Sequence, residues 1–138
     1  MVGLMLSGTS MAQDLPAGYE KIAGVWKFDQ LFADGEDFTE KFVEGRLGGQ
    51  KFVMTLNEDG SGSYDDFYAK KKDFVKLKWE YIPKEDRKER EPDIDFALKN
   101  YNSEGGYGKE KYQIEKIDDS TLILNNAGLG MKMIFKRQ

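Results

Sequence analysis

The chain has 138 residues, of which 39% are hydrophobic and 33% charged, and this length accommodates one domain with an ordinary hydrophobic core. It contains no Cys, which excludes disulfides, thiolate nucleophiles and zinc–thiolate sites. It also contains no His, which excludes Ser–His and Cys–His nucleophile pairs and every His-containing metal site. The 21 Lys and Arg residues against 25 Asp and Glu give a formal net charge of −4, so we expect no nucleic-acid partner.

Residues 1–12 (MVGLMLSGTSMA) carry no charged side chain, unlike the rest of the chain. They run from a short apolar stretch into Ser10-Met11-Ala12, and small side chains at such positions are what signal peptidase accepts. We interpret residues 1–12 as the end of a secretory signal peptide, cleaved after Ala12, followed by a single domain over residues 13–138. The expected location is then the periplasm or the extracellular space. The alternative is an uncharged N-terminus of a cytosolic protein. No other stretch is long enough for a transmembrane helix.

From Tyr19 onward, apolar and polar residues alternate, which is the pattern of strands that bury one face. The clearest run contains Leu77 and Trp79, which alternate with lysines. Asp59-Gly60 between two alternating runs predicts a hairpin, because Gly readily adopts the positive φ of a tight turn. The pattern predicts about eight strands, at residues 22–28, 52–56, 61–68, 75–81, 94–98, 112–114, 122–124 and 131–137.

One segment interrupts the alternation. Residues 37–45 (DFTEKFVEG) place Phe38 and Phe42 at helical spacing and end in Gly45, which predicts a short helix or a structured loop between the first two strands. Consecutive antiparallel strands that each have one apolar face close into a barrel or stack as a sandwich. A closed barrel of about eight strands holds either a filled core or one small ligand.

Gly24-Val25-Trp26, near the start of the first predicted strand, matches the G-x-W motif of the lipocalin and calycin superfamily. The chain resembles that family, and most of all the small lipocalin-like proteins exported by Bacteroidetes-type bacteria. The resemblance implies an all-β fold, an eight-stranded antiparallel up-and-down barrel. It also implies that Arg137, at the end of the last strand, packs on Trp26 and closes the barrel's narrow end. Alternation agrees, because Arg137 is in phase with Met133 and Phe135.

The candidate ligand site is the set of aromatic and Met side chains expected to face the interior. Such side chains offer apolar area to a small hydrophobic or aromatic ligand, and the Tyr hydroxyls would orient it. The alternative is that the same side chains simply fill the barrel. The set comprises Trp26, Phe28, Phe52, Met54, Tyr64, Trp79, Tyr81, Phe96, Tyr112, Met131 and Met133.

Four polar segments have simpler explanations than a functional site. The oxygen-rich residues 57–63 resemble a calcium loop only faintly and suit a hairpin turn. Asp65 and Asp66 are adjacent on a predicted strand, so their carboxylates point to opposite faces and cannot act together. Residues 70–72 (KKK) fit a solvated hairpin tip, and residues 84–91 fit a charged surface loop. We therefore expect no metal, no cofactor and no catalytic residue.

The leading hypothesis is an exported, monomeric, non-enzymatic protein that binds a small apolar or aromatic molecule inside its barrel. The alternative is a filled barrel that binds another protein through its charged loops. Aromatic residues expected at loop tips, Phe67, Tyr101 and Tyr107, favour this alternative slightly.

Overall fold

The computed structural model describes residues 15–46, 51–66, 73–101 and 107–138. The predicted signal-peptide remnant, Phe67 and the basic residues 70–72 lie outside this part of the chain. The side chains of Tyr101 and Tyr107 also lie outside it. Among the described residues, no helix is both long enough and apolar enough to cross a membrane.

The described residues form one antiparallel sheet with short helical segments between some of its strands. The strands are β1 (Gly24–Ala33), β2 (Glu36–Asp37), β3 (Val53–Leu56), β4 (Ser61–Asp66), β5 (Asp73–Tyr81), β6 (Phe96–Tyr101), β7 (Tyr107–Ile117), β8 (Thr121–Asn126) and β9 (Met131–Arg137). The helical segments are the 3-10 turns η1 (Tyr19–Ile22), η2 (Lys84–Asp86) and η3 (Ala127–Leu129) and the α-helix α2 (Thr39–Arg46).

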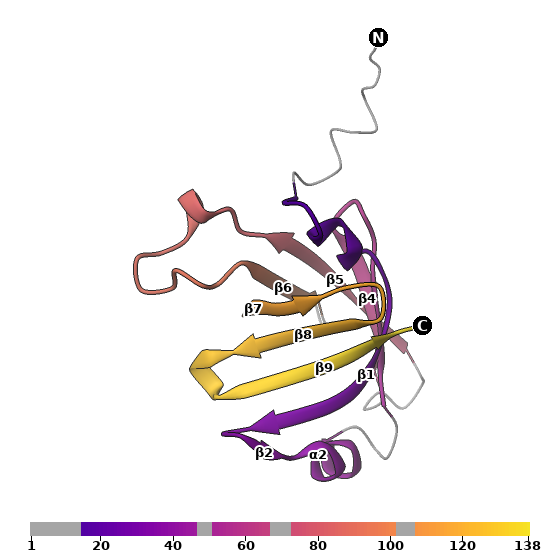
Figure 1. The fold of residues 1–138 in the computed structure, drawn as a ribbon. Helices are drawn as coiled ribbons and strands as arrows, with labels where there is room; N and C mark the ends of the chain where they lie inside the picture. The colour runs from indigo at the N-terminus through magenta and orange to yellow at the C-terminus, as the bar shows by residue number, and fades with distance from the viewer. Residues whose placement is uncertain (1–14, 47–50, 67–72, 102–106) are drawn as a thin grey trace.

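The sheet closes on itself because β1 pairs with strands on both of its sides. Residues 24–27 of β1 pair with β3, and β9 pairs with β1 from Trp26 to Ala33. Each of the remaining long strands pairs with its neighbours in the sequence. The two-residue β2 only extends the end of β1. The predicted closed, eight-stranded up-and-down barrel is therefore confirmed (Figure 1).

The helix predicted after the first strand is present as α2, and it lies beside the second half of β1 (Figure 1). The pairing of β1 with β3 ends at Lys27. Beyond it, the backbone N–H and C=O groups on that edge of β1 need other hydrogen-bond partners. Phe38 N donates to Leu31 O at 2.8 Å, and Thr39 Oγ1 accepts from Leu31 N at 2.9 Å. The Phe42 ring packs on Phe28, with centroids 5.4 Å apart. The helical segment therefore caps the strand edge and adds aromatic side chains to the core.

The hydrophobic core lies inside the barrel. The end where β1 begins and β9 finishes is called here the Trp26 end. The other, where β7 begins and β8 connects to β9, is called the Glu110 end (Figure 1). The fully buried side chains of the core come from strands around the whole barrel and from η1. The largest of them are Trp26, Phe28, Phe96, Phe135, Ile22, Leu56, Leu122 and Leu124.

Candidate functional site

The Trp26 end is sealed by the arginine that the sequence predicted to lie there. The Arg137 guanidinium carbon is 4.1 Å from the centroid of the fully buried Trp26 ring. The guanidinium also donates to four backbone carbonyls, among them Ala23 O at 3.0 Å and Asp119 O at 2.8 Å. The Trp26 indole N–H donates to Ile22 O at 2.8 Å. Arg137 thus ties η1 and the β7–β8 turn to the end of the barrel.

Gly24 completes this closure. Its φ is +149°, and a Cβ placed on it would lie 2.3 Å from Nη1 of Arg137. Because the guanidinium is held by four carbonyls, it has little freedom to move aside. The G-x-W motif therefore leaves room for the arginine that covers the tryptophan.

Several predicted interior residues belong to this sealed end. Trp79 is buried, and its indole N–H donates to Asn57 O at 2.8 Å. Tyr81 packs on Tyr19 with ring centroids 5.4 Å apart, and its hydroxyl accepts from Arg87 at 3.1 Å. These contacts anchor the loop after β5 to the barrel and give both side chains a structural role.

The remaining candidates lie farther into the barrel. Phe28, Met54, Phe96 and Tyr112 are buried. Phe52, Tyr64, Met131 and Met133 are partly buried and pack against the core. Phe52 stacks on Phe28 with centroids 5.3 Å apart and meets Tyr64 edge-on at 6.1 Å. The predicted interior set therefore lies in one barrel, from its sealed end to the start of β9, where Met131 packs against the core and also borders a groove on the outer wall.

A polar cluster also faces the interior, toward the Glu110 end. Glu110 pairs in register with the buried Leu98, and Asn100 pairs with the buried Leu77, so both side chains lie on the inner face. The Tyr112 hydroxyl donates to Oε2 of Glu110. Asn100 Nδ2 donates to Oε1 of Glu110 at 3.4 Å. We call Asn100, Glu110 and Tyr112 the inner polar cluster.

The inner polar cluster connects the core with solvent. Tyr112 is only 2% exposed, whereas Glu110 is exposed. Burial raises the pKa of Tyr112 well above its ordinary value, and the nearby Glu110 carboxylate raises it further. The Tyr112 hydroxyl is therefore a permanent proton donor to Glu110 at neutral pH. The amide oxygen of Asn100 is buried, and no hydrogen-bond partner for it is found in the described part of the chain.

Glu110 and Asn100 are not among the interior residues predicted from the sequence. The signal was present: Glu110 lies two residues before Tyr112, and Asn100 lies two residues after Leu98, so both are in phase with apolar residues. A polar side chain in an inward phase near a strand end is the feature that would have identified them.

A second buried carboxylate, Asp95, lies outside the barrel interior at the start of β6. It is 5% exposed and accepts hydrogen bonds from Ile114 N at 2.8 Å and from the Tyr19 hydroxyl at 3.2 Å. Burial raises the pKa of Asp95. The hydrogen bonds from Ile114 N and from the Tyr19 hydroxyl act in the opposite direction and lower it. Asp95 therefore joins η1 to β7 and has a structural role. In the described part of the chain, no group of three or more acidic residues is placed to hold a metal ion.

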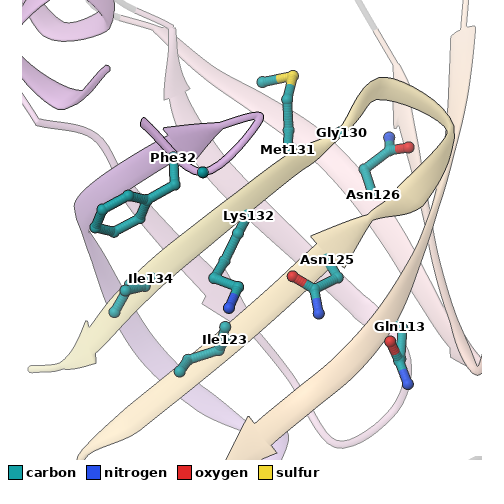
Figure 2. A pocket seen from close by; sticks show the side chains of 10 residues that line it. Phe32, Gln113, Ile123, Asn125, Asn126, Gly130, Met131, Lys132 and Ile134 are labelled. Carbon is teal, nitrogen blue, oxygen red and sulfur yellow. The ribbon is translucent and has the colours of Figure 1, made fainter. Parts of the chain in front are cut away.

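A groove of about 570 Å³ lies on the outer wall of the barrel, across β1, β8 and β9 (Figure 2). Its apolar floor comes from Phe32, Ile123 and Ile134, which occupy outward positions of these strands. Lys132 lies beside them, and its ammonium is 3.1 Å from Glu115. This groove was not predicted from the sequence, because the candidate site comprised only residues in the inward phase of each strand.

The closed barrel, its sealed Trp26 end and the arginine across it define a lipocalin-like fold. The barrel matches the crystal structure of a lipocalin-like protein from Bacteroides uniformis ATCC 8492, with a TM-score of 0.51 and 14% sequence identity. The match covers 86% of this chain and 99% of that one. At this identity the likeness establishes the fold. No protein-family model matches the sequence, and no curated protein matches it.

Proposed function

We propose that this protein binds a small apolar or aromatic molecule in the barrel interior, between the middle of the barrel and the Glu110 end. The observation that carries the proposal is the inner polar cluster, where an exposed carboxylate, a buried hydroxyl and a buried amide oxygen meet apolar walls. Ligand sites in proteins typically combine a mostly apolar lining with a few convergent polar groups.

The ligand would be held chiefly by burial of its apolar surface, which contributes about 25 cal/mol per Å². The partly buried side chains Phe52, Tyr64, Met131 and Met133 supply apolar surface. They retain some exposure, so they are the part of the predicted set that a ligand reaches with least disturbance of the core. Polar groups of the cluster would then fix its orientation.

We propose binding without catalysis. The chain has no His or Cys, and the raised pKa of Tyr112 keeps its hydroxyl protonated at neutral pH. A hydroxyl held in this way is a poor general base, because efficient proton transfer needs a pKa near the working pH. We further propose, from the composition of residues 1–12, that the protein is exported and acts outside the cytoplasm as a monomer.

A fluorescence titration with the neutral apolar dye N-phenyl-1-naphthylamine tests the proposal. Met133 faces the core, whereas its neighbour Ile134 lines the outer groove. Substitutions at these two residues therefore distinguish a ligand in the barrel interior from a ligand in the outer groove. We expect saturable binding that Met133→Phe weakens by about fivefold, equivalent to about 1 kcal/mol, because the phenyl ring takes up interior space that the dye would occupy. We expect Ile134→Phe to leave the affinity unchanged.

Two results would contradict the proposal. Absence of saturable binding by this dye and by a panel of lipids and aromatic molecules would favour the filled barrel that binds a protein partner. Loss of dye binding in Ile134→Phe but not in Met133→Phe would place the ligand in the outer groove.

A further inference from the structure

We infer that the barrel interior selects ligands that carry a protonated amine on an apolar or aromatic body, with the ammonium seated between Glu110 and Asn100. This inference rests on the proposed function, because it names the class of ligand that the same interior takes. The hydrogen-bonding capacity of the inner polar cluster and the charges around it support this inference.

The Glu110 carboxylate accepts hydrogen bonds and donates none, and it has room for more partners. A carboxylate offers about four lone-pair positions. Within the part of the chain that the structure describes, two protein donors reach it, the Tyr112 hydroxyl and Asn100 Nδ2. Both approach from the barrel wall, since they belong to β7 itself and to its neighbour β6. The remaining lone pairs suit a donor that arrives from the interior.

Asn100 adds a second acceptor in a fixed orientation. An ionised carboxylate repels an amide oxygen, so the amide nitrogen must face Glu110 and the oxygen must point away from it. That oxygen is buried and has no hydrogen-bond partner in the described part of the chain. A buried acceptor without a donor is costly, and a ligand N–H that displaces the atoms covering this oxygen would remove the cost.

The charges around the cluster favour a cation. Lys109 and Lys111 alternate with Glu110 along β7, so they lie on the outer face, where they pair with Glu80 at 3.8 Å and Glu91 at 3.1 Å. The inward cation Arg137 is engaged at the opposite end of the barrel. Among the described side chains, Glu110 therefore has no cationic partner inside the barrel. An anionic ligand would meet an uncompensated negative charge there.

The wall beside the cluster suits the apolar part of such a ligand. Leu77 and Leu98 are the register partners of Asn100 and Glu110, and both are buried. Tyr64 lies close enough to Tyr112 to contribute to its raised pKa. Aliphatic and aromatic surfaces thus adjoin the two acceptors. A ligand with an ammonium at one end and a hydrocarbon or ring at the other matches this arrangement.

The experiment compares three ligands of equal chain length: decylamine, decanol and decanoate. Each displaces N-phenyl-1-naphthylamine from the protein at neutral pH, below its critical micelle concentration. We expect decylamine to bind about tenfold more tightly than decanol, the ratio that one charge-assisted hydrogen bond supplies, and decanoate to bind most weakly.

Two variants assign the preference to the cluster. Glu110→Gln removes the charge and keeps the shape, so it should bring decylamine to the affinity of decanol while decanol binding stays unchanged. Glu80→Gln is the matched control, because Glu80 is an exposed carboxylate on the outer face of β5. It should preserve the preference for the amine. Circular dichroism verifies that both variants are folded.

The outcomes separate this inference from the proposed function. Saturable dye binding with equal affinities for decylamine and decanol would overturn the amine selectivity and leave interior binding intact. An equal loss of selectivity in Glu110→Gln and Glu80→Gln would also overturn it, because it would trace the preference to the net charge of the protein. If the dye and all three ligands fail to bind, both proposals are wrong.

Discussion

Replacing Arg137 by Ala tests whether the barrel is held closed at its Trp26 end. The substitution removes the contact with the Trp26 ring, at 4.1 Å, and four hydrogen bonds to backbone carbonyls. The cation–π contact contributes about 0.5–2 kcal/mol. Each hydrogen bond contributes ~0.5 kcal/mol, below the value for a buried charged donor, because several of these carbonyls are accessible to water. The expected loss is therefore about 2.5–4 kcal/mol in the free energy of unfolding.

Urea unfolding followed by tryptophan fluorescence measures this loss directly. Arg90→Ala is the control, because Arg90 is exposed in the loop between β5 and β6 and should change stability by less than about 0.5 kcal/mol. Arg137→Lys keeps the charge but loses the planar group that contacts several carbonyls at once, so it should show about half of the loss or more. If Arg137→Ala is as stable as the control, Arg137 does not hold the closure together.

Three further predictions concern the same end of the barrel. Gly24→Ala should cost about 1–3 kcal/mol, because it strains the backbone and displaces Arg137. In a double-mutant cycle its effect should shrink in the Arg137→Ala background, and full additivity would contradict the steric argument. Asp118 accepts hydrogen bonds from Ser120 N and Thr121 N, which lower its pKa from 3.8 to about 2. An NMR titration should find that pKa, and the stability that Asp118 contributes should be lost as the pH falls from about 4 toward 2; a value near 3.8 would refute this. Asp95 has a raised pKa, so the folded state holds its proton more tightly and stability should fall as the pH rises above 3.8. Asp95→Asn should flatten this part of the curve of stability against pH, and an unchanged curve would contradict the assignment.

The sequence alone predicted the strands, because alternation identifies a strand whenever one of its faces is buried, whereas the closed barrel was implied by the resemblance to the lipocalin family. Hairpin signals such as Asp59-Gly60 then ordered consecutive strands as neighbours, and Gly60 does have a positive φ of 92°. Closure needed the Trp26–Arg137 pairing, which joins the two ends of the chain. The resemblance to the lipocalin family implied that pairing, and the phase of Arg137 in the last strand agreed with a position on the inner face.

The sequence could not predict where alternation breaks. A bulge between Phe28 and Gln30 reverses the phase of β1, so that Leu31 is buried and Phe32 lies on the outer wall. Bulges depend on how the strand bends against its neighbours, which a single-strand pattern does not contain. The outer groove follows from this bulge, because Phe32 is part of its floor.

The inner polar cluster was missed for a different reason. The predicted strand covered only residues 112–114, so Glu110 fell outside it, whereas β7 begins at Tyr107 and the strand pairing places Glu110 opposite Leu98. A charged residue in an inward phase departs from the binary pattern of a barrel, and such departures are typical of functional sites. The lesson for similar sequences is to examine polar residues that fall in phase with the core.

The most direct test of the account is a two-dimensional NMR titration of the protein with decylamine. We predict that the largest shifts occur at the side-chain amide of Asn100 and the backbone amides of Glu110 and Tyr112. The indole N–H of Trp26, at the sealed end, should not move. Shifts confined to Ile123, Ile134 and their neighbours in the outer groove would contradict ligand binding inside the barrel.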